Sequence, residues 1–167
     1  MSRAMEARKA LEWLILREQK GKYPNVPEKA RYVPNLKLTT TNGLTSGVIK
    51  YIQLSGGIAE RRNNTGRYIQ PTTYDNIFGK EVVLKKGMHI KGTGKNGTAD
   101  ISGIYNGVPL AIEIKLGKDK QSKEQIEYQI EFERVGGYYL IAKTFAQFYE
   151  DFNKLFKINS PEIPVQG

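Results

Sequence analysis

The chain has 167 residues and a mass of 18.9 kDa, with 39% hydrophobic and 26% charged residues and no cysteine. This is the size and composition of one globular domain, and it excludes a disordered tail, a disulfide scaffold, a thiolate zinc site and a cysteine nucleophile. The single histidine, His89, also excludes a histidine-rich metal site. No apolar run approaches the roughly 20 residues of a membrane span, so we expect a cytoplasmic protein without a signal peptide or a membrane partner.

The net charge of +9 is distributed unevenly along the chain. Residues 1–123 hold 22 Lys and Arg against 10 Asp and Glu, whereas residues 124–167 hold 4 against 7. A basic body with a mildly acidic C-terminal part favours an anionic polymer as partner, most simply nucleic acid. The alternative is that the excess lysine only keeps the protein soluble.

The N-terminal segment, residues 1–41, reads as a helix followed by an extended connector. Apolar residues at spacings of three and four predict a helix over 4–20, and three prolines mark 22–41 as the connector. The run from Trp13 to Leu16 is more apolar than one helix face needs. This suggests the hypothesis that the helix packs against a second subunit.

The segment from 42 to 97 gives a weaker signal. A second helix is expected to begin near Thr45, followed by a strand over 58–62 and a turn over 63–66. Within 67–97, residues 82–84 are a candidate strand, but five glycines favour a mobile stretch. Its lysines fit either a loop that wraps DNA or an ordinary solvated loop.

From residue 98 onward the elements are clearly marked. Two strands, 98–105 and 108–116, are joined by Asn106-Gly107, a strong signal for a two-residue hairpin turn. A helix from Ser122 to about Val135, a strand over 138–142 and a helix capped by Thr144 with a buried phenylalanine stripe follow. The whole order predicts an α/β fold, a mixed β-sheet flanked by helices, with its core in 42–158 and a flexible tail at 159–167.

The hairpin brings two carboxylates together. If Tyr105 pairs with Val108, the same register sets Asp100 opposite Glu113, on the face that also carries Lys115. Like charges in opposite positions need compensation, which a divalent cation such as Mg²⁺ or Mn²⁺ supplies well. The alternative is that Lys115 is only the carboxylates' salt-bridge partner on a solvated hairpin.

Asp100 followed by Glu113-Ile114-Lys115 resembles the D…ExK signature of the PD-(D/E)xK nuclease superfamily. The surrounding blocks look like those of its VRR-NUC branch, especially small stand-alone proteins of phage or bacterial origin. These blocks are residues 56–66, 97–101, 112–115 and 122–125, within a resemblance that spans 44–143. Ala99 departs from the proline that usually precedes the aspartate.

The resemblance implies a restriction-endonuclease-like fold and a Mg²⁺-dependent DNA endonuclease in which Mn²⁺ can substitute. Asp100, Glu113 and the backbone carbonyl of Ile114 would be the metal ligands, and Lys115 would orient the attacking water or stabilise the developing negative charge. Gln125 would lie at the edge of the site, although Ser122-x-x-Gln125 is also a capping box.

The resemblance further implies a homodimer that cuts branched DNA such as four-way (Holliday) junctions, in a bacterial cell or a phage-infected host. The alternatives are a nonspecific or nicking phage nuclease and a DNA-binding module that has lost catalysis. Many superfamily members carry an acidic residue on the helix before the first strand. Residues 45–57 hold none, which favours one metal ion per site.

Basic residues around the motif are candidate DNA contacts, because phosphates attract lysine and arginine. The alternative for each is an ordinary surface charge, and His89 is most simply incidental. The candidates are Lys118, Lys120, Lys123, Arg61, Arg62, Arg67, Lys91 and Lys95.

Overall fold

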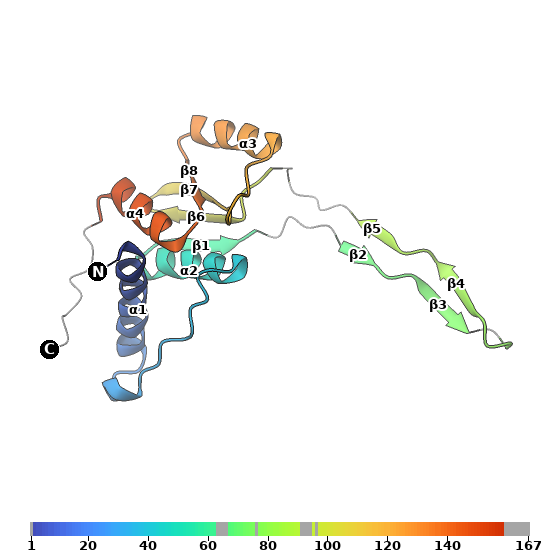
Figure 1. Cartoon of the computed structure of the whole chain (residues 1–167), viewed down its shortest axis with the longest axis horizontal. Coiled ribbons are helices and arrows are strands. Elements are labelled where there is room, and N and C mark those ends of the chain that lie inside the picture. The colour runs from blue at the N-terminus through green and yellow to red at the C-terminus, as the bar shows by residue number, and fades with distance from the viewer. Residues whose placement is uncertain (1, 63–66, 76, 91–94, 96, 159–167) are drawn as a thin grey trace.

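The computed structural model describes residues 2–62, 67–75, 77–90, 95 and 97–158. Its body is a mixed four-stranded sheet in the order β1-β6-β7-β8, with helices on both faces (Figure 1). The strands are β1 (Ile58–Arg61), β6 (Ile101–Tyr105), β7 (Val108–Ile114) and β8 (Tyr138–Ala142). β1, β6 and β7 pair antiparallel, whereas β8 runs parallel to β7. The predicted α/β class is confirmed, and the arrangement is compatible with a restriction-endonuclease-like fold. The predicted tail at 159–167 and the predicted turn at 63–66 lie outside the described residues.

The central hairpin has the predicted two-residue turn. Asn106 and Gly107 both have positive φ, 50° and 78°, as this tight turn requires. Tyr105 therefore pairs with Val108, and the ladder keeps the predicted register as far as Ile101 and Ile112. β7 is nevertheless buried on both faces, because helices lie above and below it.

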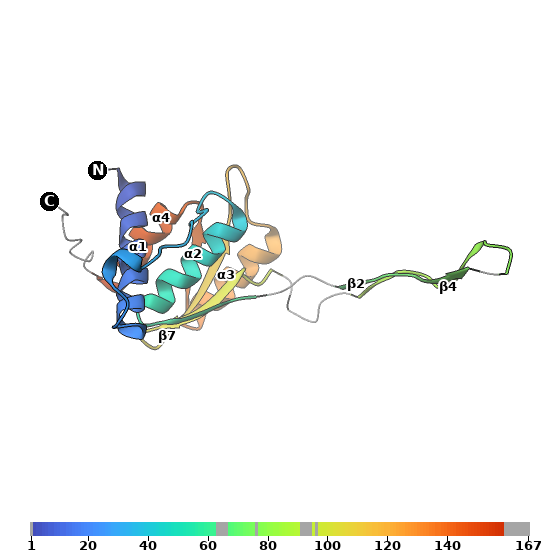
Figure 2. The same ribbon diagram turned by 90° about the horizontal axis from the view of Figure 1, so that it is seen from below.

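Three helices cover one face of the sheet and one covers the other (Figures 1 and 2). Leu110, Ile112 and Ile114 of β7 point into the larger core, whereas Ala111 and Tyr139 face the single helix on the opposite side. The three helices are α1 (Arg3–Lys22), α2 (Thr41–Leu54) and α4 (Phe145–Phe156), and the single helix is α3 (Lys123–Arg134).

The larger core is built around α4, whose predicted phenylalanine stripe is buried. Tyr51 of α2 makes edge-on ring contacts with Phe148 and Phe152, at centroid distances of 6.1 and 5.8 Å. Its hydroxyl donates to Asn153 Oδ1 at 2.8 Å, so the buried polar tip is satisfied. Among the described residues, no helix is long and apolar enough to cross a membrane.

The N-terminal elements differ from the prediction in two places. α2 begins at Thr41 rather than near Thr45, because Thr40 caps it by accepting from the Gly43 amide, and its first three residues are not apolar. The connector contains a short 3₁₀ helix, η1 (Glu28–Ala30). In α1, Ile15 is buried in the chain's own core, and α1 packs against α4 and α2, which explains part of the apolar run without a second subunit.

Residues 67–75 and 77–90 form a two-stranded ribbon, of which the sequence indicated only one candidate strand. The pairs are β2 (Arg67–Ile69) with β5 (Met88–Ile90), and β3 (Thr72–Asp75) with β4 (Glu81–Lys85). The candidate strand at 82–84 is confirmed within β4. The ribbon extends away from the body in both views (Figures 1 and 2).

Candidate active site

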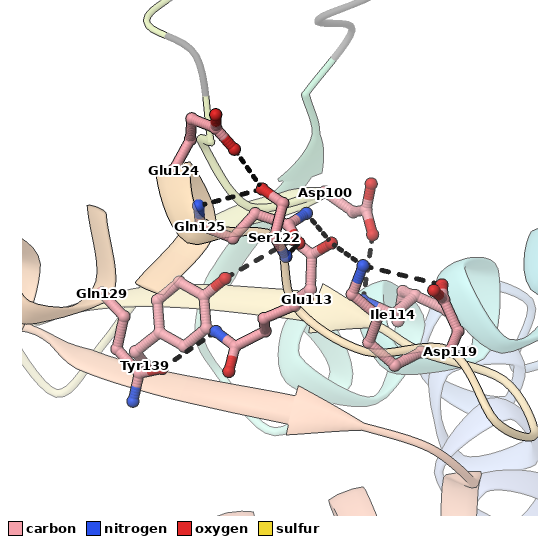
Figure 3. Close-up of polar contacts among 11 residues, drawn as sticks. Asp100, Glu113, Ile114, Asp119, Ser122, Glu124, Gln125, Gln129 and Tyr139 are labelled. Carbon is pink, nitrogen blue, oxygen red and sulfur yellow. Dashed lines mark hydrogen bonds and ion pairs between the residues drawn. The ribbon is translucent and has the colours of Figure 1, made fainter. Parts of the chain in front are cut away.

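Asp100 is fixed to the end of β7 by a backbone hydrogen bond. Its Oδ2 accepts from the Ile114 amide at 2.9 Å (Figure 3). It directly precedes β6, and one further step of the β6–β7 register sets it opposite Glu113. The negative charge of Asp100 contributes to the raised pKa of Glu113. The hydrogen bond from Ile114 and the register of the ladder both agree with the predicted pairing of Asp100 with Glu113.

Glu113 is a buried carboxylate, with 2% of its surface exposed. Its pKa is raised mainly by burial and, to a lesser extent, by the charge of Asp100, because both disfavour the charged form of Glu113. Its Oε1 accepts from Gln125 Nε2 at 2.5 Å and lies 3.3 Å from Lys115 Nζ. Its Oε2 accepts from the Tyr139 hydroxyl at 3.5 Å. The result is a fixed, partly compensated negative charge beside a second carboxylate.

Lys115 is part of this buried cluster and not of a solvated hairpin. It is 8% exposed, and its Nζ lies 3.3 Å from Glu113 Oε1 and 3.6 Å from Asp119 Oδ2. The alternative interpretation was therefore right about the ion pair with Glu113 and wrong about the solvent. A lysine held here places a positive charge next to the carboxylates in a region of low dielectric constant.

Gln125 has both of the roles that the sequence left open. Its Oε1 accepts from the Ser122 amide at 2.9 Å, while the Ser122 hydroxyl accepts from the Gln125 amide, which completes the capping box of α3. Its Nε2 donates to Glu113. The start of α3 thus positions the Glu113 carboxylate (Figure 3).

Two residues of the cluster were missed in the sequence analysis, Tyr139 and Asp119. Tyr139 lies on β8, and the parallel pairing of β8 with β7 puts it on the same face as Glu113, two positions before Ile141, the partner of Glu113. Burial, and secondly Glu113, raise its pKa, so the hydroxyl stays protonated and can donate. Nothing in the sequence reveals this contact unless the β7–β8 register is known.

The donor set suits a hard divalent cation. Asp100 and Glu113 supply carboxylate oxygens, the ligands that Mg²⁺ and Mn²⁺ prefer. In the described part of the chain, no group of three or more His, Asp or Glu side chains could hold a metal. α2 has no Asp or Glu, so it supplies no third carboxylate. The predicted carbonyl of Ile114 and water would have to complete the coordination of one ion.

Some predicted DNA contacts lie close to the carboxylates. The Arg62 amide donates to the Asp100 carbonyl at 2.7 Å, so Arg62 continues β1 beside Asp100. Lys118 and Lys120 are exposed on the loop between β7 and α3. Lys123 is exposed in the first turn of α3, where it lies 3.8 Å from Glu127. All four lie on segments that adjoin the carboxylates in the chain or in the sheet.

Other predicted contacts are not brought to the site. Arg61 points to the opposite side of the sheet, where it donates to Asn42 Oδ1 at 3.0 Å. Lys95 forms an ion pair with Glu131 of α3. Arg67 begins β2 on the ribbon, but its side chain is not among the described ones, and Lys91 lies outside the described residues altogether.

The chain matches no protein-family model and no curated protein. The VRR-NUC resemblance therefore stays a prediction, and any function has to be argued from the site itself.

Proposed function

We propose that this protein is a Mg²⁺-dependent endonuclease that hydrolyses DNA phosphodiester bonds, with Mn²⁺ able to substitute. The observation that supports this most is the cluster of Asp100, Glu113 and Lys115 at the end of one hairpin, two carboxylates and a lysine within a buried network. The basic residues around it, and the chain's charge of +9, favour a polyanionic substrate.

Each residue of the cluster has a distinct part in this proposal. Asp100 and Glu113 hold the cation, which when bound neutralises charge on the phosphate and lowers the pKa of a water molecule. Gln125 and Tyr139 keep the Glu113 carboxylate in one orientation through hydrogen bonds to its two oxygens. Lys115 presents its ammonium group to the attacking water or to the charge that develops on the phosphate.

The surrounding charges position the substrate. Arg62 lies beside Asp100, and Lys118 and Lys120 follow the end of β7, so a DNA backbone crossing this edge of the sheet meets cations on both sides of the carboxylates. We further propose branched DNA as the substrate and a homodimer as the active form, because two such centres are needed to cut two strands of a junction symmetrically.

One observation favours a second candidate, a DNA-binding module without catalysis. α2 contributes no acidic residue, so the site has fewer carboxylates than many members of the superfamily it resembles. In that case the Glu113–Lys115 pair would be purely structural, and DNA would bind equally well with or without a metal.

Cleavage of end-labelled DNA separates these candidates. A four-way junction, a matched linear duplex and a supercoiled plasmid are incubated with wild-type protein in Mg²⁺, Mn²⁺ or EDTA. The matched variants are Glu113→Gln and, as a control on the same side of the molecule, Glu127→Gln, because Glu127 is exposed and contacts only Lys123 in the ion pairs of α3. We expect symmetric, metal-dependent junction cuts that only Glu113→Gln abolishes. Junction binding without cleavage in either metal would support the binding module, and nicking of all three DNAs would support the nonspecific nuclease.

A further inference from the structure

The tip of the ribbon, residues 77–80, carries the most exposed large apolar side chains of the described chain. Ile77 is 94% exposed and Phe78 is 82% exposed. They lie where the chain passes from β3 to β4, at the end of the ribbon farthest from the body (Figure 2). Two adjacent large apolar residues so exposed at the end of a projection indicate a contact surface.

The charge of this region favours a nucleic acid as partner. Residues 62–96 hold seven Lys and Arg against two Asp and Glu, a net charge of +5, more than half of the chain's +9. The described ribbon side chains Lys80, Lys85 and Lys86 are all exposed. Binding an apolar protein partner would not require this excess of positive charge, whereas the phosphates of a DNA backbone attract it.

The ribbon leaves the body at the edge of the sheet that carries the carboxylates. The strand preceding the ribbon, β1, ends at Arg61. The next residue, Arg62, donates its amide to the Asp100 carbonyl at 2.7 Å, and Asp100 follows the ribbon in the chain. A two-stranded ribbon can lie in a groove of B-DNA. From Arg67 to Asp75 the ribbon is about 26 Å long at the usual rise of a strand, roughly three quarters of a turn of the double helix.

We propose that the ribbon lies along DNA bound at the carboxylate cluster and that Ile77 and Phe78 insert between bases at its tip. Apolar wedges of these residue types open base steps and kink duplexes. Insertion is cheapest where the stacking is already interrupted, so the tip selects a branch point over a continuous duplex. This inference rests on the proposed function, because it assumes that DNA is the substrate, and it adds a device that recognises branches.

The test measures base unstacking without cleavage. Wild-type protein in EDTA is titrated into a four-way junction with 2-aminopurine at the branch point, and into a linear duplex with the same label. The variant is Ile77→Ser with Phe78→Ser, and the control is Val135→Ser, an apolar residue 71% exposed at the far end of α3 from Gln125. We expect the junction signal to rise with wild type and control, and the tip variant to lose that rise and bind the junction about 10-fold more weakly. Duplex affinity should change less than about 2-fold.

Three results would overturn the proposal. The tip variant could keep the 2-aminopurine rise and the junction affinity, or the wild type could fail to bind either DNA. Light scattering could instead show that the tip variant halves the mass of a wild-type dimer, which would make the tip a contact between copies of the chain. Unstacking without any metal-dependent cleavage would leave this inference standing and refute only the nuclease proposal.

Discussion

Replacing Gln125 with alanine removes two hydrogen bonds with different purposes, and their energies can be separated. The bond from the Ser122 amide to Gln125 Oε1 belongs to the helix cap, and the bond from Gln125 Nε2 belongs to Glu113. A neutral hydrogen bond contributes about 1 kcal/mol and one to a charged group about 1.5–3 kcal/mol. We therefore expect Gln125→Ala to lower the free energy of unfolding by about 2.5–4 kcal/mol.

Ser122→Ala is the matched variant, because it removes the other half of the capping box, the hydroxyl that accepts from the Gln125 amide, and leaves the bond from Gln125 to Glu113 in place. Loss of an N-cap costs about 1 kcal/mol, and each kcal/mol lowers the Tm of a chain of this size by about 2–4 °C. Urea unfolding in EDTA at neutral pH measures both variants. Cleavage should fall at least about 10-fold in Gln125→Ala and stay near wild type in Ser122→Ala.

Equal losses of stability in the two variants, with equal cleavage, would refute this reasoning. The second hydrogen bond of Gln125 would then contribute nothing, and its role would be capping alone. The pH dependence of Mg²⁺ binding gives a further check on the role of Gln125. Gln125 lowers the Glu113 pKa, so its removal should move Mg²⁺ binding to higher pH, where Glu113 is deprotonated.

Three more predictions follow from the cluster and its supports. Because burial raises the Glu113 pKa above the ordinary 4.5, the folded chain holds this proton more tightly than the unfolded chain. Without metal, the contribution of Glu113 to the free energy of unfolding should therefore fall as the pH rises from 4.5 through the raised pKa. Urea unfolding in EDTA at several pH values should show this pH dependence in the wild type and not in Glu113→Gln. The same pH dependence in both proteins would contradict the prediction. Mg²⁺ at ten times its Kd should stabilise the wild type by about 1.4 kcal/mol in thermal melts, and an equal gain in Asp100→Asn would argue against the site. Gly97 has a φ of +79°, and a Cβ there would lie 2.2 Å from the Glu124 carbonyl oxygen. Gly97→Ala should therefore lower the free energy of unfolding by about 2–4 kcal/mol. Gly136→Ala is the control and should cost about 1 kcal/mol, because its Cβ would meet nothing within 4 Å. Similar losses of stability for the two variants in urea unfolding would show that the structure relieves the contact at Gly97.

The parts of the fold that depend on neighbouring residues could be predicted from the sequence. Asn106 and Gly107 are residue types that adopt positive φ, so they define the turn and the register that pairs Asp100 with Glu113. The capping box from Ser122 is equally local. These signals are short in sequence and have one dominant geometry, which is why they could be recognised without a structure.

The parts that depend on distant packing could not. Glu113 looks like a surface position in an alternating strand, and its burial arises from α3 and from β8, which begins at Tyr138. The contact from Tyr139 needs the β7–β8 register, which no turn determines. The ribbon could not be predicted from the sequence, because its glycines, such as Gly79 at φ +69°, indicate turns but do not show which strands the turns connect.

The hydrogen bond between Arg62 and Asp100 also affects how the chain can change over evolution. These two residues touch at 2.7 Å although residues 63–99 separate them, so the ends of the inserted segment already meet in the folded sheet. Doubling the length of a segment whose ends meet costs only about 0.6 kcal/mol of closure entropy. Lineages can therefore lengthen, shorten or replace this insertion almost independently of the hairpin that holds the carboxylates. The same four-stranded sheet can in this way carry projections of different length and sequence.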